Sequence, residues 1–175
     1  MSPTLPTPTM TRFVRLAAAC LTLAAAAGRA AAQEVGLPVG TRAPAAAVET
    51  LDGKPADLAA VAARGPVLVE FWATWCPNCK ALEPQIKQLA QRYAGRVRLV
   101  AVAVSVNQSP ERVRAYAAKY QLPVELYYDR AGKATSAYDV PATSYVLVVD
   151  RAGKVVYTGQ GAEQNLDAAV RLALR

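Results

Sequence analysis

The sequence contains no histidine and only three cysteines among its 175 residues. The absence of histidine excludes Ser-His and Cys-His catalytic pairs, a histidine-ligated haem and most zinc or copper sites, because histidine is the base or a main ligand in each. Two of the cysteines, Cys76 and Cys79, are three positions apart, and the third, Cys20, lies in the N-terminal segment. Two cysteines alone make a poor metal site, so the pair is the candidate for other chemistry.

Acidic residues are the minority of the charged residues, with 13 Asp and Glu against 20 Lys and Arg. Removing Arg12, Arg15 and Arg29, which precede the first acidic residue Glu34, lowers the net charge from +7 to +4. A surplus that small, without a basic run or interleaved aromatic residues, favours a mixed solvated surface and no nucleic-acid partner. The length and the 53% share of apolar residues suit one globular domain, with no internal repeat.

The first 32 residues have the pattern of a secretory signal peptide. Arg12 and Arg15 give a positively charged start, and Leu16–Ala27 is an apolar stretch of the usual length. Ala30–Ala32 then provide the small residues of a cleavage site before Gln33. The pattern predicts export from the cytoplasm and a soluble periplasmic or otherwise extracytoplasmic mature protein.

Two other interpretations of residues 1–32 are an uncleaved membrane anchor and lipid attachment at Cys20. The apolar stretch is short for a membrane span and Arg29 interrupts it, while the apolar run continues past Cys20, where a lipid site should end it. With the signal removed, we expect a linker over residues 33–39 and a single domain over residues 40–175.

Strands and helices are expected to alternate along this domain. Continuous apolar runs predict buried strands, and apolar residues at helical spacing behind capping residues predict helices. Pro84 lies inside the longest predicted helix and predicts a kink. A mixed sheet covered on both faces is the expected architecture. The predicted strands are 46–51, 54–56, 67–71, 97–104, 124–127, 145–149 and 154–158, and the predicted helices are 58–63, 76–93, one opened by Ser109-Pro110-Glu111, one from Asp129 to Tyr138, and 166–174.

The Cys76-x-x-Cys79 pair follows a strand and opens a helix. At the start of a helix, the N-terminus stabilises the thiolate of Cys76, which should be the more exposed sulfur with the lower pKa. Cys79 is one turn further along and can attack a mixed disulfide formed by Cys76. The spacing therefore predicts a dithiol built for exchange.

Glu70 interrupts the otherwise apolar strand that leads to the cysteines. A buried carboxylate has a raised pKa and can accept the proton of a neighbouring thiol. The alternative is that Glu70 faces water at a strand edge.

These features resemble the TlpA/ResA-type extracytoplasmic thiol-disulfide oxidoreductases of the thioredoxin fold. The resemblance extends from Val39 to Leu174 and implies an α/β thioredoxin fold: a mixed central sheet flanked by helices, an N-terminal β-hairpin, and an inserted helix-strand element between Pro110 and Tyr127. The motifs that carry it are Gly40-x-x-Ala43-Pro44, Leu51-Asp52-Gly53-Lys54, Phe71-Trp72-Ala73-Thr74-Trp75-Cys76-x-x-Cys79-Lys80, Pro84, Tyr138-x-Val140 and Asp150-x-x-Gly153-Lys154-Val155-Val156.

The resemblance also implies roles. Cys76 would be the nucleophile and Cys79 the buried resolving thiol of a redox disulfide, and Glu70 matches the buried carboxylate of thioredoxins. The expected partners are client proteins with cysteine pairs and a membrane thiol-disulfide transporter as electron donor, and no cofactor or metal is expected. The candidate substrate-binding residues are Trp75, Pro77, Asn78, Thr143 and Ser144.

The sequence departs from the family at two positions. Some members carry a glutamate three residues after the second cysteine, where this chain has Leu82, so the adjacent Glu83 is expected to face solvent. The family also has a cis-proline facing the cysteines, and Ser144 occupies that position unless the loop is rebuilt so that Pro141 serves. A cis bond before a residue other than proline costs about 2.5–4 kcal/mol, so we expect a trans bond before Ser144.

The favoured function is extracytoplasmic reduction of client disulfides, with apocytochrome c as a narrower candidate. Oxidase or isomerase action stays open, because direction depends on the reduction potential. A thiol peroxidase is an alternative that Thr143-Ser144 slightly favours and Trp75-Cys76-x-x-Cys79 disfavours. A metal-handling or redox binding module is disfavoured by the lack of histidine and of methionine near the pair.

Overall fold

The structure, a computed structural model, describes Met1 and residues 36–175. The predicted signal peptide, with Cys20 and the cleavage site before Gln33, lies outside the described residues. Within residues 36–175, no helix has the length and apolar character needed to cross a bilayer.

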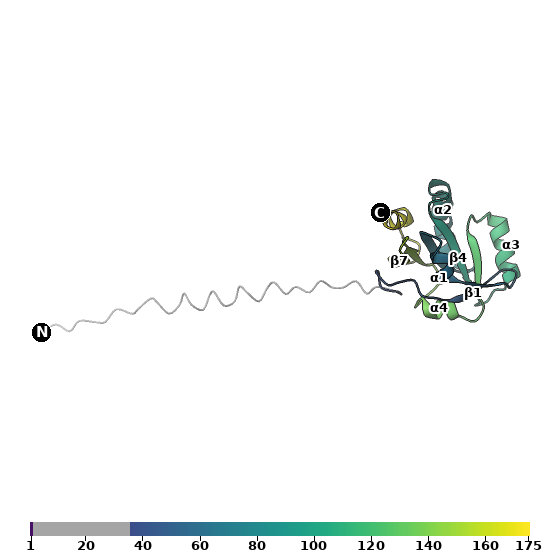
Figure 1. The fold of residues 1–175 in the computed structure, drawn as a ribbon, viewed down its shortest axis with the longest axis horizontal. Helices are drawn as coiled ribbons and strands as arrows, with labels where there is room; N and C mark the ends of the chain where they lie inside the picture. Colours follow the sequence, from purple (N-terminus) through teal and green to yellow (C-terminus); the bar gives the residue numbers. More distant parts are fainter. Residues whose placement is uncertain (2–35) are drawn as a thin grey trace. The chain divides into compact units, whose positions relative to one another are not determined.

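The domain is built on one seven-stranded mixed sheet with the strand order β2-β1-β5-β4-β3-β6-β7 (Figure 1). β3 pairs in parallel with β4, and β4 with β5, whereas the other neighbours are antiparallel. The central strand β3 is buried along its whole length, as its apolar sequence predicts. The strands are β1 Ala47–Thr50, β2 Pro55–Asp57, β3 Val67–Trp72, β4 Arg98–Val104, β5 Glu125–Asp129, β6 Tyr145–Val149 and β7 Val155–Gln160.

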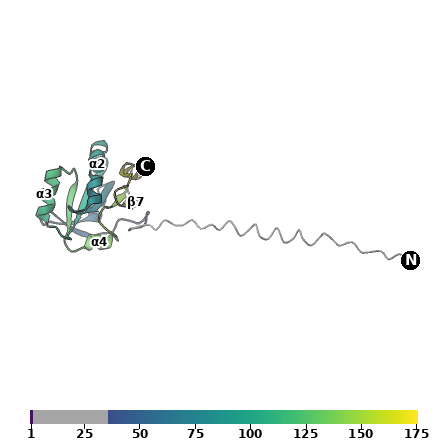
Figure 2. The ribbon, with the colours of Figure 1, turned by 180° about the vertical axis from the view of Figure 1, so that it is seen from behind.

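Helices cover both faces of the sheet. The alternation of side chains along β3 sends Val67, Val69 and Phe71 into the apolar layer beneath α1 and α4, and Leu68 and Trp72 toward α2, α3 and α5. Figures 1 and 2 show α4 on the opposite side of the sheet from α2 and α3. The helices are α1 Leu58–Ala62, α2 Pro77–Arg92, α3 Pro110–Tyr120, α4 Lys133–Ala137 and α5 Leu166–Ala173.

The predicted thioredoxin architecture is confirmed, including the β1–β2 hairpin, the inserted α3–β5 element and Pro84 inside α2. The predicted caps also form: the Ser109 hydroxyl accepts the Arg112 amide at 3.3 Å, and the Asn165 side chain accepts the Ala168 amide at 3.0 Å.

The segment around Asp129 differs from the prediction. The strand expected at 124–127 runs to Asp129, and α4 starts only at Lys133. The Asp129 carboxylate accepts the amides of Ala134 at 3.2 Å and Thr135 at 2.8 Å. Asp129 therefore accepts backbone amides at the start of α4, as expected of a cap. It does so from the end of β5, and a turn separates it from the helix.

Residues 36–39, predicted to be part of a linker, are packed on the domain. The Leu37 amide donates to the Tyr145 hydroxyl at 3.0 Å, and the Gly40 amide donates to the Val155 carbonyl at 2.8 Å. Gly36 has a φ of 82°, and a Cβ there would lie 2.2 Å from the Tyr145 hydroxyl. Residues 36–39 therefore pack against the domain that the sequence predicts from residue 40, and the close approach to Tyr145 requires glycine at position 36.

Candidate active site

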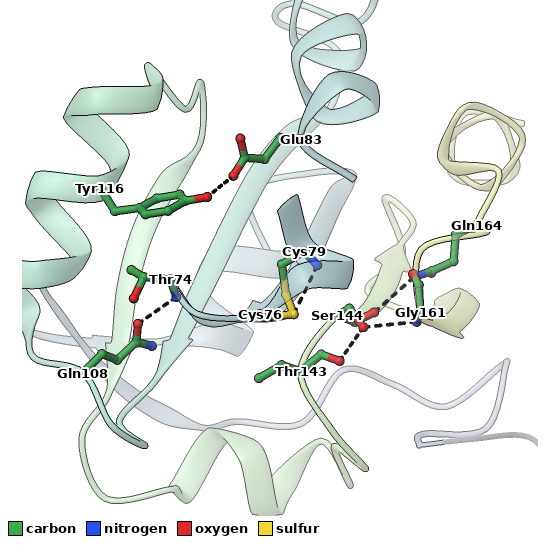
Figure 3. Close-up of a disulfide and its surroundings, with 10 residues drawn as sticks. All are labelled: Thr74, Cys76, Cys79, Glu83, Gln108, Tyr116, Thr143, Ser144, Gly161 and Gln164. Atoms are coloured by element: carbon green, nitrogen blue, oxygen red, sulfur yellow. Dashed lines mark hydrogen bonds between the residues drawn. A yellow bond between two sulfur atoms is a disulfide. The ribbon is translucent and has the colours of Figure 1, made fainter. Parts of the chain in front are cut away.

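The two cysteines lie at the junction of β3 and α2 (Figure 3). Cys76 is the N-cap of α2, Pro77 is at the first helical position, and Cys79 lies in the first turn. The sulfurs form a disulfide, with 5.4 Å between the two Cα atoms. The Cys79 amide donates to the Cys76 sulfur at 3.1 Å. The helix terminus thus directs a backbone donor and its positive end at Cys76, as stabilisation of a thiolate requires.

Both sulfur residues are buried in this disulfide form, with Cys76 2% and Cys79 4% exposed. In this form the Cys76 sulfur accepts the Cys79 amide at the start of the helix. The expectation that Cys76 is the more exposed thiol concerns the reduced protein and stays a prediction. Trp75, Pro77 and Asn78, three of the predicted substrate-binding residues, are exposed around the pair.

Trp75 is fixed by the loop that follows β4. Its indole Nε1 donates to the Val106 carbonyl at 2.8 Å, and 40% of the residue remains exposed. Gln108 of the same loop accepts the Thr74 amide at 2.9 Å and donates to the Val104 carbonyl at 2.6 Å. Gln108 therefore holds the segment that precedes the cysteines, and no local sequence pattern indicated it.

A surface cleft of about 490 Å³ is lined in part by Trp75, the residue before Cys76, and neither cysteine belongs to its lining. Trp75 and Val106 line one part of it, and Pro141 and Thr143 line another. The structure thus brings together Trp75 and Thr143 among the predicted substrate-binding residues. Pro77 and Asn78 are exposed at the start of α2 and are not part of the cleft lining.

Ser144 is fully buried, which corrects the prediction that it contacts substrate. Every peptide bond among the described residues is trans, as expected for Ser144, and the alternative Pro141 is exposed in the cleft. Ser144 has a φ of 64°, which proline cannot adopt, and its amide donates to the Phe71 carbonyl at 2.9 Å. The loop is therefore held by a backbone hydrogen bond that a proline at this position could not make.

A side-chain network secures Ser144 from the segment before α5 (Figure 3). The Ser144 hydroxyl accepts the Gly161 amide at 3.2 Å, and its carbonyl accepts the side-chain amide of Gln164 at 3.1 Å. Gln164 also donates to the Gly161 carbonyl at 2.7 Å and accepts the Tyr157 hydroxyl at 3.1 Å. Gln164 is buried and positions the loop, and sequence reasoning missed it.

Glu70 is buried beneath the cysteines, so the alternative of a water-facing strand edge is wrong. It is 7% exposed, and its Oε1 atom has no hydrogen-bond partner in the protein. Burial, and secondarily the charge of Glu83, raises the pKa of Glu70 to about 8. Glu70 shares a small cavity with Cys79, which places a carboxyl of high proton affinity beside the second sulfur.

Glu83 does not face solvent freely, contrary to the prediction. It is half-buried, lines the same cavity as Glu70 and Cys79, and accepts the Tyr116 hydroxyl of α3 at 2.6 Å (Figure 3). Glu83 is four residues after Cys79, and this spacing puts both side chains on one face of α2. The helical spacing was the signal in the sequence that could have placed Glu83 near the site.

The arrangement combines an N-capping thiol, a second thiol one turn later and a buried acid beside it. These groups support thiolate attack, disulfide exchange and proton transfer. The described part of the chain holds no cluster of three or more Cys, Asp or Glu side chains placed to bind a metal ion.

Comparison with known proteins gives a consistent picture. The family model described as Redoxin matches residues 38–171. The chain is 32% identical over 142 residues to "Thioredoxin-like protein YneN" of Bacillus subtilis (strain 168), which covers 77% of this chain and 82% of that protein. It is 26% identical over 129 residues to "Thiol-disulfide oxidoreductase ResA" of Bacillus thuringiensis subsp. konkukian (strain 97-27), covering 74% and 73% of the two chains.

Among solved structures, a thiol:disulfide interchange protein of the thioredoxin family from Chlorobium tepidum TLS superposes with a TM-score of 0.64 at 25% identity, covering 79% of this chain and 99% of that one. The matched residues include β3, the cysteine pair and the sheet that supports them. The chain therefore belongs to the Redoxin family and is a TlpA/ResA-like thiol-disulfide oxidoreductase of the thioredoxin fold, with Cys76 and Cys79 as its cysteine pair.

Proposed function

We propose that the protein acts outside the cytoplasm as a reductant of client disulfides. The observation that carries the proposal is the cavity that Cys79 shares with the buried carboxyl of Glu70. A carboxyl beside Cys79 can take its proton, and the Cys79 thiolate can then resolve a mixed disulfide and release a reduced client. The direction of electron flow itself depends on the reduction potential of the pair.

In the proposed reaction, the Cys76 thiolate attacks one sulfur of a client disulfide. A bond forms between Cys76 and that sulfur, and the other client sulfur leaves as a thiolate that takes a proton from water. Cys79 then loses its proton to Glu70 and attacks the Cys76 sulfur, which releases the second client thiolate. Two electrons pass to the client, and the protein is left with the Cys76–Cys79 disulfide.

Glu70 suits the proton-transfer step in both directions. Its pKa is raised to about 8, close to the value of about 8.5 for an ordinary thiol, so moving a proton between Glu70 and Cys79 costs little. In the disulfide form at pH 7, Glu70 is mainly a carboxylic acid. It is then ready to protonate Cys79 when an electron donor opens the disulfide at Cys76.

The proposed partners follow from the surface and the N-terminal sequence. The cleft lined by Thr143 and by Trp75, which precedes Cys76 in the chain, offers a client segment a place to dock. Clients with cysteine pairs, including apocytochrome c, are the proposed substrates, and a membrane thiol-disulfide transporter is the proposed donor. Extracytoplasmic action is supported by the signal pattern of residues 1–32, and N-terminal sequencing of the native protein should begin at or near Gln33.

The reduction potential of the Cys76–Cys79 pair tests the proposed direction. Equilibration with defined thiol-disulfide buffers should give a potential below about −220 mV, on the side of thioredoxin and away from the oxidant DsbA near −120 mV. A potential near −120 mV would contradict a reducing role. Insulin reduction without peroxide consumption is expected in parallel, whereas rapid consumption of peroxide would favour a thiol peroxidase.

The order of the cysteines is tested by trapping. Cys79→Ser should accumulate mixed disulfides with clients through Cys76, and Cys76→Ser should accumulate none. Alkylation of the reduced protein at mildly acidic pH should label Cys76 first. Labelling of Cys79 first would reverse the proposed order.

A further inference from the structure

A small cavity beneath the second cysteine has the size and chemistry of a water site. Its volume is about 20 Å³, and Glu70, Trp72, Cys79 and Glu83 are among the residues that line it. A cavity of roughly 10–15 Å³ or more holds one water when polar groups are available to it. Two buried polar atoms among its lining residues, Glu70 Oε1 and Trp72 Nε1, have no partner in the protein. An acceptor and a donor are therefore available to one water molecule.

Glu83 connects this cavity with the protein surface. It lines the cavity from α2, yet it remains partly exposed, unlike Glu70. The Tyr116 hydroxyl donates to Glu83 Oε1 at 2.6 Å and holds the carboxylate between α2 and α3 (Figure 3). Burial first, and then this hydrogen bond, raises the pKa of Tyr116, so its hydroxyl remains a donor through neutral pH.

We propose that Glu83, held by Tyr116, is a positioning residue that completes the proton path between Glu70 and solvent through one water molecule in the cavity. The proposal rests on the proton-transfer role of Glu70 given above. At pH 7 the Glu70 acid first passes its proton to the cavity water, which releases another to the Glu83 carboxylate, and Glu83 loses that proton to bulk water. The Glu70 carboxylate that remains can then take the proton of Cys79 as Cys79 attacks the mixed disulfide.

The charged and titratable groups around Glu70 come from two elements. α2 contributes Cys79 and Glu83, and α3 contributes Tyr116. The remaining lining residues from β4 and from the segment before β5 are apolar, and none of the described residues that line the cavity is a lysine or arginine. Since the Glu83 charge is the one charged neighbour that raises the pKa of Glu70, a change at Glu83 must alter the titration of Glu70.

The test is a carbon-13 NMR titration of the glutamate carboxyls in the disulfide form, in which the cysteines do not titrate. Glu70→Gln assigns the Glu70 signal, which should titrate near pH 8 in the unaltered protein. In Glu83→Gln the midpoint should fall by about half a pH unit, because a like charge is removed. Tyr116→Phe should shift it less. Glu163→Gln removes an equal charge at an exposed position that does not line the cavity and should leave the midpoint unchanged.

Exchange kinetics supply the second readout. Glu83→Gln should slow disulfide reduction at pH 7 by about tenfold, less than the hundredfold or more expected when an acid-base group itself is lost. Tyr116→Phe should give an intermediate rate, and Glu163→Gln the rate of the unaltered protein. A cross-peak between the Trp72 indole proton and long-lived water is expected in the disulfide form, and its absence would overturn the water path.

The outcomes separate this inference from the proposed function. If Glu70 titrates near pH 8 and Glu70→Gln slows exchange, but Glu83→Gln changes neither the midpoint nor the rate, the path through Glu83 is overturned and the role of Glu70 stands. If Glu70 instead titrates near its ordinary value of 4.5, its proposed role fails first.

Discussion

Two groups of buried polar side chains flank the disulfide, and they differ in how completely they are hydrogen-bonded. On one side, the amide, hydroxyl and carbonyl of Ser144 and both side-chain polar atoms of Gln164 have partners. On the other, Glu70 and Trp72 each keep a buried polar atom without a partner in the protein. Figure 3 shows Ser144 and Gln164 on one side of the cysteines. On the other side it shows Glu83, which lines the cavity that contains Glu70 and Trp72, and Tyr116, which donates to Glu83.

We infer from this difference that the Ser144 side holds a loop in place, whereas the Glu70 side takes part in proton transfer. A fully bonded buried network fixes a loop in one conformation. A buried carboxyl without full bonding lowers stability, because the desolvated group is only partly compensated. The loss of stability caused by burying Glu70 is explained if Glu70 exchanges a proton with Cys79. The comparison predicts that changes on the Ser144 side lower stability without altering the pH dependence of exchange, whereas changes on the Glu70 side alter the pH dependence of both stability and exchange.

The largest expected effect is that of Ser144→Pro. Proline requires a φ near −65°, whereas Ser144 has a φ of 64° and donates its amide to Phe71. The free energy of unfolding should fall by about 3 kcal/mol or more in urea denaturation. Ser144→Gly is the matched control, because it keeps the backbone conformation and the amide, and it should cost only about 1 kcal/mol. Equal stability of the two variants would show that the loop tolerates a different backbone.

Glu70→Leu should raise stability and slow exchange together. In the unfolded chain Glu70 ionises near its ordinary value of 4.5, while in the folded protein it keeps its proton to about pH 8. The free energy of unfolding of the unaltered protein therefore decreases as pH rises from about 4.5 to 8, by about 3 kcal/mol at pH 7. Denaturation curves of Glu70→Leu should lack this decrease. Parallel pH dependence in the two proteins would mean that Glu70 is not protonated preferentially in the fold.

Gln164→Ala should cost about 2 kcal/mol, because it leaves the buried Ser144 carbonyl without its donor. The pH profile of disulfide exchange should keep its shape, since Gln164 is not part of the Glu70 cavity. Gln91→Ala, at an exposed position of α2, is the control for truncation of a glutamine and should change stability little. A shifted pH profile in Gln164→Ala would show that the Ser144 side also affects the pH dependence of exchange, which would contradict the comparison.

Tyr157→Phe should have the smallest effect. It removes one hydroxyl that donates to Gln164 at 3.1 Å from a half-buried position at the rim of the network. A loss of about 1 kcal/mol is expected, with exchange kinetics unchanged. A loss as large as that of Gln164→Ala would show that the hydroxyl is essential to the orientation of the amide.

The parts of the fold that local patterns encode could be predicted from the sequence. The run Tyr145–Val149 forms the predicted strand, and Ser109 and Asn165 cap the helices that they were expected to cap. Buried strands and helix starts depend on neighbouring residues, so a single sequence carries the signal. For the same reason, the cysteine pair Cys76 and Cys79 and the burial of Glu70 could be predicted from the sequence.

The supporting contacts could not be predicted, because they join residues distant in sequence. Gln108 reaches Thr74 across 34 positions, and Tyr116 reaches Glu83 across 33. The burial of Ser144 likewise depends on Gln164, twenty residues later. Glutamine and tyrosine in these loops and helices have no local signature, so only the folded arrangement of the chain assigns them a role.

The central claim is that Glu70 exchanges a proton with Cys79, and the pH dependence of a single turnover tests it most directly. Reduction of a model disulfide by the reduced protein should show an inflection near pH 8 that follows the Glu70 carboxyl. Glu70→Gln should lose this inflection and slow the second step about a hundredfold or more, while alkylation of Cys76 keeps its rate. An unchanged rate and pH profile in Glu70→Gln would contradict the claim and leave Glu70 a structural residue.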